Sequence, residues 1–320
     1  MRVKLMAIIG LWLLPLVASA QPFPSKPITM IVPFAAGGPA DVVARALAAS
    51  MGKTQTIVIE NVGGAGGNIG VLRAAKARPD GYTLLFTGIG MAVSPALYAK
   101  LEYNSVTDFE PISLAAFTPL VVMSRKGLMS GTFGEFRQAI ESGSLKVTIG
   151  NSGPGSASHL CAILLMSALR TNFILVPYRG TAPAMTDLIG GQLDMLCDAA
   201  GAAAPQLERG VVSAAGVTTL ERSSLLPNVP TLQEQGVAGF KFLNFTALYA
   251  PKGTPQPIVS TLNDMVRQAI DDPAYRAALA KFGNVPPPRE RATPADLATF
   301  LKNEIDRWGP IIKAANIRVE

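Results

Sequence analysis

The segment around Gly37 and Gly38 has the residue types of an anion-binding site. The apolar run 28–34 leads directly into the two glycines, which permit a tight turn and expose backbone N–H groups. Pro39 suits the first position of a helix, and Asp41 can cap its first turn. Unpaired amides and the dipole of a helix N-terminus attract negative charge, so the segment predicts a site for a carboxylate or phosphate. An ordinary β-to-α connection is the alternative.

A second loop of this kind covers residues 152–156, where Ser-Gly-Pro-Gly-Ser follows a β-rich run and opens a helix. Two such helix N-termini can face each other across a cleft. If Gly37 and Gly38 belong to one domain and Gly153 and Ser156 to the other, the two loops would clamp a carboxylate when the domains close. Neutral donors hold an anion without a formal countercharge, which suits capture followed by release.

Serine and histidine residues near the second loop suggest a different chemistry. Residues 150–154 resemble the nucleophile elbow of a hydrolase, but Pro154 occupies the place of the last glycine. His159, the only histidine, would have to act as the base for Ser152 or Ser156. Alternatively, Ser156 is a helix N-cap and His159 lies on the helix face or in a wall of the site. A secreted Ser/His hydrolase is therefore one alternative function.

Other cofactor and metal sites lack their usual residues. In the segment 64–70, Ile69 stands where a dinucleotide fingerprint needs its third glycine, so a tight turn with helix capping is the better explanation. One histidine and two cysteines argue against a zinc site. Cys161 and Cys197 could form a disulfide or remain two separate buried thiols. We expect no cofactor and no metal.

Short β-rich runs alternate with helical patterns along the chain, which is typical of an α/β fold with parallel strands and crossover helices. The expected strands cover 28–34, 56–60, 82–87, 120–123, 146–150, 173–177, 194–197, 214–218 and 245–250. Amphipathic helices are expected over 257–282 and 294–314, packed back on the first domain.

Ligands of such open sheets bind outside the carboxyl ends of the strands. Glycine and small polar residues gather at five of these ends, namely 35–38, 87–90, 151–156, 180–182 and 198–201. The five loops can converge on one cleft.

The first 20 residues have the order of a secretory signal peptide. Arg2 and Lys4 precede the apolar run 5–17, and small residues lead to a cleavage expected after Ala20. The run is shorter than the about 20 residues of a spanning helix, and no cysteine near it can accept a lipid. We therefore expect a soluble periplasmic protein.

Size and charge limit the other classes of function. About 300 mature residues and 49% hydrophobic content suffice for two domains with sizeable cores. The net charge of +6 falls to +4 without Arg2 and Lys4, and the remaining basic residues are scattered. This pattern does not resemble a nucleic-acid footprint, so no nucleic-acid partner is expected.

Nine ordered motifs extend over nearly the whole mature chain: 27–38, 59–67, 78–84, 108–112, 156–160, 176–180, 187–194, 228–231 and 250–255. In these motifs the chain resembles the tripartite tricarboxylate transporter receptors, the Bug-type periplasmic solute-binding proteins. The resemblance implies an α/β fold of two-lobe, Venus-flytrap architecture, in which each lobe is a mostly parallel sheet flanked by helices. Lobe 1 would comprise residues 21–123 and 245–320, and lobe 2 residues 124–244, with crossing strands at 120–123 and 245–249 as the hinge.

The resemblance also implies the function. The protein would capture a small organic carboxylate between its lobes and present it to membrane subunits of a tripartite tricarboxylate transporter, as a monomer and without catalysis. A periplasmic sensor that feeds a membrane signalling protein would share every pocket residue, so it is a second alternative.

Loops 34–38 and 152–156 would hold the ligand carboxylate through backbone amides and waters, and less constant residues would meet its other end. Asp198 would either select ligands with an amino or hydroxyl group or cap its own strand end. The family usually has Asp-Asn where this chain has Asp198-Ala199, so no named ligand is transferred. The candidate ligand-binding residues are Phe34, Ala35, Ala36, Gly37, Gly38, Asp41, Thr87, Gly88, Met91, Ser152, Gly153, Gly155, Ser156, His159, Tyr178, Thr181, Ala182 and Asp198.

Overall fold

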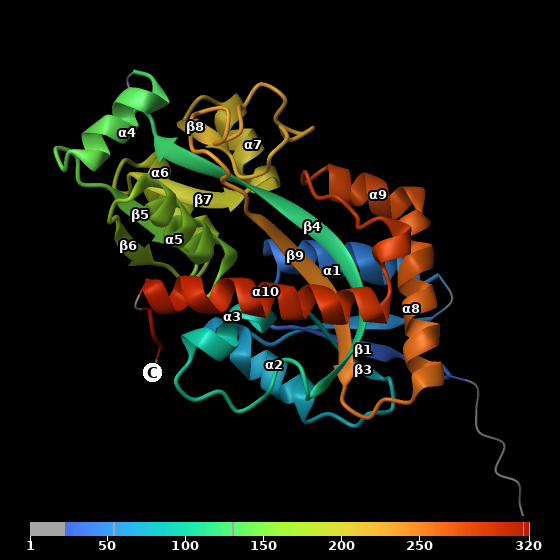
Figure 1. The fold of residues 1–320 in the computed structure, drawn as a ribbon. Coiled ribbons are helices and arrows are strands. Elements are labelled where there is room, and N and C mark those ends of the chain that lie inside the picture. The colour runs from blue at the N-terminus through green and yellow to red at the C-terminus, as the bar shows by residue number, and fades with distance from the viewer. Residues whose placement is uncertain (1–22, 54, 130, 316, 320) are drawn as a thin grey trace, which may run out of the picture.

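Strands and helices alternate along the chain in the computed structural model, which describes residues 23–53, 55–129, 131–315 and 317–319 (Figure 1). The expected signal peptide, residues 1–20, lies outside them. The strands are β1 (Ile28–Val32), β2 (Ile57–Asn61), β3 (Thr83–Gly88), β4 (Phe109–Arg125), β5 (Thr148–Asn151), β6 (Ile174–Pro177), β7 (Met195–Ala199), β8 (Val212–Val217) and β9 (Leu243–Pro251). The helices are α1 (Pro39–Met51), α2 (Asn68–Ala75), α3 (Gly90–Leu97), α4 (Phe133–Glu141), α5 (Ala157–Leu169), α6 (Thr181–Ile189), α7 (Ala200–Glu208), α8 (Gln256–Asp271), α9 (Pro273–Ala280) and α10 (Pro294–Ala314).

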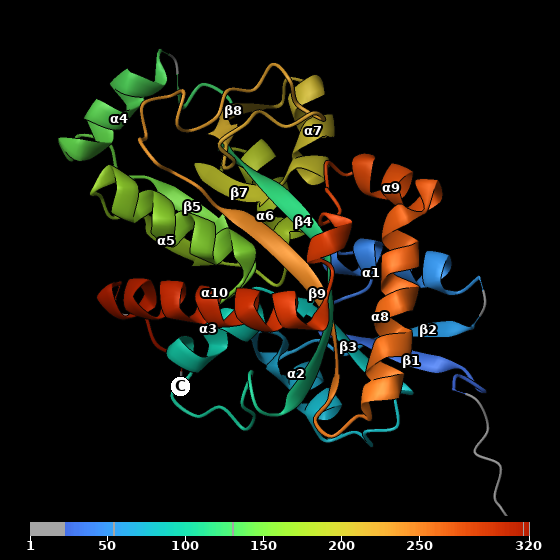
Figure 2. The same ribbon diagram turned by 45° about the vertical axis from the view of Figure 1, so that its right-hand side comes forward.

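The strands form one sheet with the order β2-β1-β3-β9-β4-β7-β5-β6, and β8 also pairs with β4. Strands β2, β1 and β3 are parallel to one another, and so are β7, β5 and β6. Every antiparallel pair involves β4 or β9, the two long strands in the centre. Figure 2 shows the resulting two-lobe α/β architecture, with β1 to β3 in the first lobe and β5 to β8 in the second.

Strand β4 belongs to both lobes. It pairs with β9 from Phe109 to Pro119 and with β7 and β8 from Leu120 to Arg125. The expected strand covers only residues 120–123 of it. Proline, which is unusual inside a central strand, stands at position 111 in the part that was not expected. The structure accommodates Pro111 through a register irregularity between Pro111 and Ser113.

Thr218 lies at the point where β4 stops pairing with β9 and begins to pair with β8. Its N–H donates to Leu120 O at 2.9 Å, and its Oγ1 accepts from Leu120 N at 3.2 Å. The same hydroxyl donates to Phe242 O at 2.8 Å, and Phe242 N donates to Thr218 O at 2.8 Å. Since Thr218 is fully buried, these bonds satisfy backbone groups that water cannot reach.

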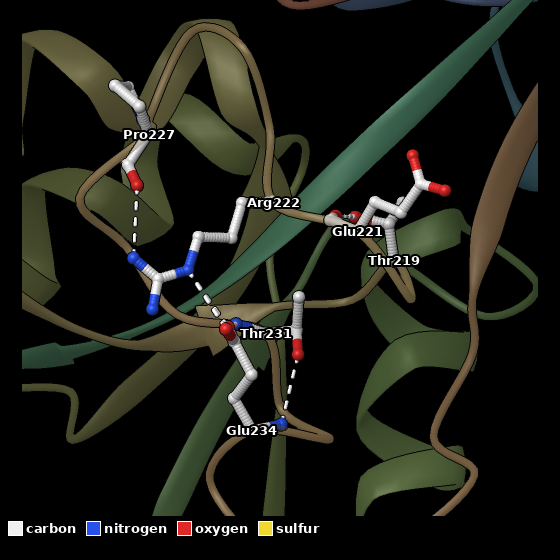
Figure 3. A network of polar contacts seen from close by, with 6 residues as sticks. All are labelled: Thr219, Glu221, Arg222, Pro227, Thr231 and Glu234. Carbon is white, nitrogen blue, oxygen red and sulfur yellow. Dashed lines mark hydrogen bonds and ion pairs between the residues drawn. The ribbon is translucent and has the colours of Figure 1, made fainter.

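The connection from Thr218 to β9 is irregular and is held by its own side chains (Figure 3). Arg222 donates through Nε to Glu234 at 3.0 Å and through NH1 to Pro227 O at 3.2 Å. Glu234 and Thr231 exchange two further bonds, of 3.0 and 2.6 Å. The exposed ion pair alone contributes little, about 0–1 kcal/mol, so the hydrogen bonds to backbone groups define the path of the segment.

The carboxyl-terminal helices pack on the first lobe, as the sequence predicts. Helices α8 and α9 cover α1, and α10 crosses the sheet centre against α3 and β4 (Figure 2). In α10, fully buried Trp308 meets Phe242 edge to face, with ring centroids 5.6 Å apart. Helix α10 therefore backs the segment that leads into β9.

A disulfide joins Cys161 of α5 to Cys197 of β7, with a Cα–Cα distance of 6.3 Å. Both cysteines are fully buried in the second lobe. Of the two alternatives that the sequence leaves open, the structure contains the bridge.

We expect reduction of this disulfide to weaken folding substantially. The bridge closes a loop with a sequence separation of 36, for which the loss of loop entropy in the unfolded chain corresponds to about 3–4 kcal/mol. Urea unfolding with and without dithiothreitol measures the difference. The double variant Cys161→Ala/Cys197→Ala is the control and should show no dependence on the reductant; an unchanged wild-type midpoint would contradict the prediction.

Candidate functional site

All five predicted loops connect the carboxyl end of a strand to a helix. They join β1 to α1, β3 to α3, β5 to α5, β6 to α6 and β7 to α7. Because β1 and β3 are parallel, their loops lie at the same edge of the first lobe, and the same holds for β5, β6 and β7 in the second. Each loop opens a helix, so each presents first-turn amides at that edge.

Asp41 holds the loop of the first lobe in shape. Its carboxylate accepts from Gly37 N and Arg45 Nε, both at 2.8 Å, and from Asn61 Nδ2 at 2.9 Å. Asn61 also donates to Phe34 O at 3.1 Å. Burial alone would raise the pKa of Asp41, but the bonds from Arg45, Gly37 and Asn61 outweigh it and lower the pKa. Asp41 thus organises the loop, and Asn61 is its partner that sequence reasoning missed, although it lies in the motif 59–67.

The backbone amides of Gly37, Gly38, Gly153 and Gly155 all have acceptors within the protein. Besides Gly37, Gly38 N donates to Ala35 O at 3.3 Å, Gly153 N to Asn151 Oδ1 at 3.0 Å, and Gly155 N to His159 Nδ1 at 3.2 Å. Each N–H already has an acceptor in the protein, because the tight turns that need glycine also close on themselves. These glycines shape the loops.

The donors that remain lie one step further along, in the first turns of the helices. The N–H groups of Ala40 and Asp41 in α1, and of Ala157 and Ser158 in α5, have no hydrogen-bond partner among the residues that the structure describes. Ala35 and Ala36, before α1, are exposed. Two helix N-termini, one from each lobe, therefore retain the unpaired amides that bind anions.

The serines and the histidine of the second loop do not form a hydrolase pair. Ser156 is the N-cap of α5 and accepts from His159 N at 3.2 Å. The hydroxyls of Ser152 and Ser156 lie 3.0 and 3.1 Å from Ser158 Oγ. Burial lowers the pKa of His159 to about 4, so the imidazole is neutral at pH 7, and Nδ1 accepts from Gly155. Its proton is therefore on Nε2.

Asp198 and Thr181 meet at the same edge of the second lobe, at the carboxyl ends of β7 and β6. Asp198 is the last residue but one of β7 and is buried. Burial raises its pKa to about 6, although Ala199 N and the Thr181 hydroxyl bond to it and oppose the shift. The Ala199 bond, of 2.8 Å to Oδ1, is the capping contact expected of a strand-end residue. Among the described residues no cation acts on the Asp198 carboxylate, so a hydrogen-bond donor placed next to it would stabilise its charged form.

The remaining candidates differ in access. The Tyr178 hydroxyl donates to the carboxylate of Asp187 in α6 at 2.8 Å. Ala182 is exposed in the first turn of α6. Met91 is fully buried in the hydrophobic core, since it lies on the apolar face of α3. Thr87 is also buried, and a Cβ on Gly88 would lie 1.8 Å from Phe245 O. Gly88 is therefore needed for the approach of β3 to β9.

A cavity of about 300 Å³ lies away from these loops, lined by Thr29, Ile31, Glu60, Arg73, Ala77 and Thr83. The two charged residues of its lining, Arg73 and Glu60, form an ion pair with each other at 2.7 Å. In the described part of the chain no group of three or more His, Cys, Asp or Glu residues is placed to hold a metal ion. None of the helices described is both long and apolar enough to cross a membrane.

Comparison with known proteins assigns the family. The family model described as "Tripartite tricarboxylate transporter family receptor" matches residues 42–317. An Agrobacterium vitis protein, "UPF0065 protein in the TAR-I ttuE-ttuC' intergenic region", is 44% identical over 306 residues, which cover 95% of this chain and 88% of that protein.

Two solved structures share the fold over nearly the whole chain. The periplasmic binding protein BugD matches with a TM-score of 0.85 and 38% identity, covering 93% of this chain and all of that one. MatC from Rhodopseudomonas palustris with bound malate matches with a TM-score of 0.83 and 39% identity, covering 91% of this chain and all of that one. The loops, the sheet order and these matches together show that the chain belongs to the tripartite tricarboxylate transporter receptor family.

Proposed function

We propose that this protein is a periplasmic receptor that captures a small organic carboxylate between its two lobes and presents it to membrane subunits of a tripartite tricarboxylate transporter. The observation that carries the proposal is the pair of helix N-termini, α1 and α5, whose first-turn amides have no partner among the described residues. Backbone donors on opposite lobes bind an anion and release it when the lobes separate. MatC, which matches 91% of this chain, contains bound malate, a carboxylate.

The proposal extends to the lobes and to the location. Lobe 1 consists of residues 21–123 and 245–320 and lobe 2 of residues 124–244, and they turn about the place where β4 exchanges its partners. A signal peptide that is cleaved after Ala20 directs the chain to the periplasm, where BugD functions as a binding protein by its name. The mature protein acts as a monomer and carries out no catalysis.

Asp198 gives the site its selectivity. An ionised, buried carboxylate repels a plain acid but accepts a hydrogen bond from a ligand hydroxyl or amino group. Burial raises the pKa of Asp198, and only two neutral donors, Ala199 N and the Thr181 hydroxyl, oppose this effect. A hydroxyl or amino group of a ligand would therefore stabilise the ionised carboxylate further.

The two alternatives have separate tests. A hydrolase requires a serine hydroxyl bonded to the imidazole of His159, whereas the hydroxyls of Ser152 and Ser156 bond to Ser158 and Nδ1 of His159 accepts from Gly155 N. An ester turnover screen on wild type and His159→Ala decides that alternative. A sensor would use the same pocket, and a pull-down that retrieves a signalling protein in place of transporter subunits would favour it.

Replacing Ala157 by proline tests the amide site directly. Ala157 is the first residue of α5 and the preceding Ser156 has extended backbone angles, so proline fits there and removes only the N–H. Loss of a charge-assisted hydrogen bond costs about 1.5–3 kcal/mol, or roughly ten- to a hundredfold in affinity. Calorimetry with malate as the probe should show this loss without a lower melting temperature.

Ala157→Ser keeps the N–H and is the matched control, for which we expect wild-type affinity. The dimethyl ester of malate should bind far worse than malate to the wild type. If the ester binds as tightly as the acid, or if proline at position 157 leaves affinity unchanged, the ligand carboxylate does not use the N-terminus of α5.

The pH dependence of stability should reveal the burial of Asp198. Its folded pKa of about 6 exceeds the ordinary 3.8, so the native state binds the proton more tightly and loses stability as pH rises from 3.8 through 6. Asp198→Asn removes this loss and should stabilise the ligand-free protein by about 2–3 kcal/mol at pH 7.5, and by little below pH 3.5. The His159 contribution cancels in the difference, which urea unfolding across this pH range measures. A difference independent of pH would refute the assignment.

Selectivity provides a separate test of Asp198. Asp198→Ala should reduce the preference for malate over succinate, which lacks only the hydroxyl, by roughly tenfold or more. Titration calorimetry gives the two dissociation constants. Equal affinity ratios in the variant and the wild type would leave Asp198 as a strand-end cap.

A further inference from the structure

Gly155, in the loop before α5, lies against helix α3 of the other lobe. A Cβ atom built on Gly155 would lie 2.8 Å from Leu97 Cδ2 and 3.5 Å from Val93 Cγ2, and no other atom would lie within 4 Å. Val93 and Leu97 are four residues apart and face the same side of α3. At Gly155 the loop therefore faces α3.

The contact leaves no room for a side chain at position 155. Carbon atoms pack best at about 3.5–4.0 Å, so a methyl group on Gly155 would overlap Leu97. Leu97 is fully buried in the core, so moving the end of its side chain would disturb the packing around it. A side chain at position 155 would either displace Leu97 within the core or push the two lobes apart.

The position in the sheet makes this contact sensitive to lobe rotation. Strand β5 is separated from β4 by β7, and β3 is separated from β4 by β9. With neighbouring strands about 4.8 Å apart, both the Gly155 loop and α3 begin about 10 Å from the shared strand. A rotation about β4 therefore separates Gly155 from Leu97.

We propose that the fit of Gly155 against Leu97 sets the balance between the open and closed forms of the receptor. Gly155 is a positioning residue, since its missing side chain allows the lobes to meet and bring the N-termini of α1 and α5 together. The neighbouring Pro154 supports this contact, because its carbonyl oxygen lies 3.1 Å from the Cβ position of Gly66 in the first lobe. This inference rests on the proposed capture of a ligand between two lobes, and it identifies the contact that limits how closely the lobes approach.

A double-mutant cycle across the two lobes tests the proposal. Gly155→Ala adds the overlapping methyl, and Leu97→Ala removes its partner. Gly153→Ala is the matched control, because Gly153 and Gly155 have φ angles of +102° and +75°, but a Cβ on Gly153 meets no atom within 4 Å. Both alanines carry backbone strain, and only the one at position 155 meets the other lobe.

The readouts are the radius of gyration without ligand, from small-angle scattering, and the affinity for malate. Gly155→Ala should increase the radius and weaken malate binding by roughly tenfold, as expected when the closed form is less populated. In the Leu97→Ala background, the Gly155→Ala change should have little effect on either the radius or the affinity for malate. Gly153→Ala should lower the melting temperature and keep the wild-type radius.

An unchanged radius in Gly155→Ala, or no recovery in the double variant, would overturn the proposal. The radii do not depend on the ligand, so they test the contact even if wild type fails to bind malate. That failure would count against malate as a ligand of the proposed receptor and not against the contact.

Discussion

The backbone of Leu120 is shared by the two lobes, and the rest of the site depends on how it is held. On one side of it β4 pairs with β9, and on the other with β7 and β8. The Thr218 hydroxyl accepts from the Leu120 N–H, and it also donates to the carbonyl oxygen of Phe242, which leads into β9. Because β4 runs through both lobes, it fixes the positions of the loop-bearing strand ends relative to the point where β4 changes partners.

Two buried aspartates at these loops show how the surroundings decide the role of the same chemical group. Asp41 has Arg45, Asn61 and the Gly37 amide around it, so its charge is satisfied and its pKa is lowered. Asp198 has only neutral donors, and burial raises its pKa to about 6. The first carboxylate is committed to holding a loop. The second retains a need for a donor, which a ligand hydroxyl or amino group can meet.

Most elements could be predicted because their signals are local. Helix α10 runs from Pro294 to Ala314 as expected, and the loops at the strand ends are where the glycine and small polar residues lie. The first half of β4 was not predicted, since proline normally interrupts a strand and only pairing with β9 accommodates it. For a similar reason the sequence did not reveal that the glycine amides of the loops already have acceptors within the protein. Composition shows that a turn is tight, but not that its own carboxylate, carbonyl or imidazole already accepts the N–H.

The sequence by itself determined the alternation of strands and helices, the loops that open helices and the motifs of the family, because these depend on residues close together in the chain. The tertiary structure decided which groups remain available. It brought Cys161 to Cys197, buried Asp198 without a cation, and placed Gly155 against Leu97. These outcomes depend on packing between segments that are tens of residues apart, and a single sequence carries no local signal of such distances.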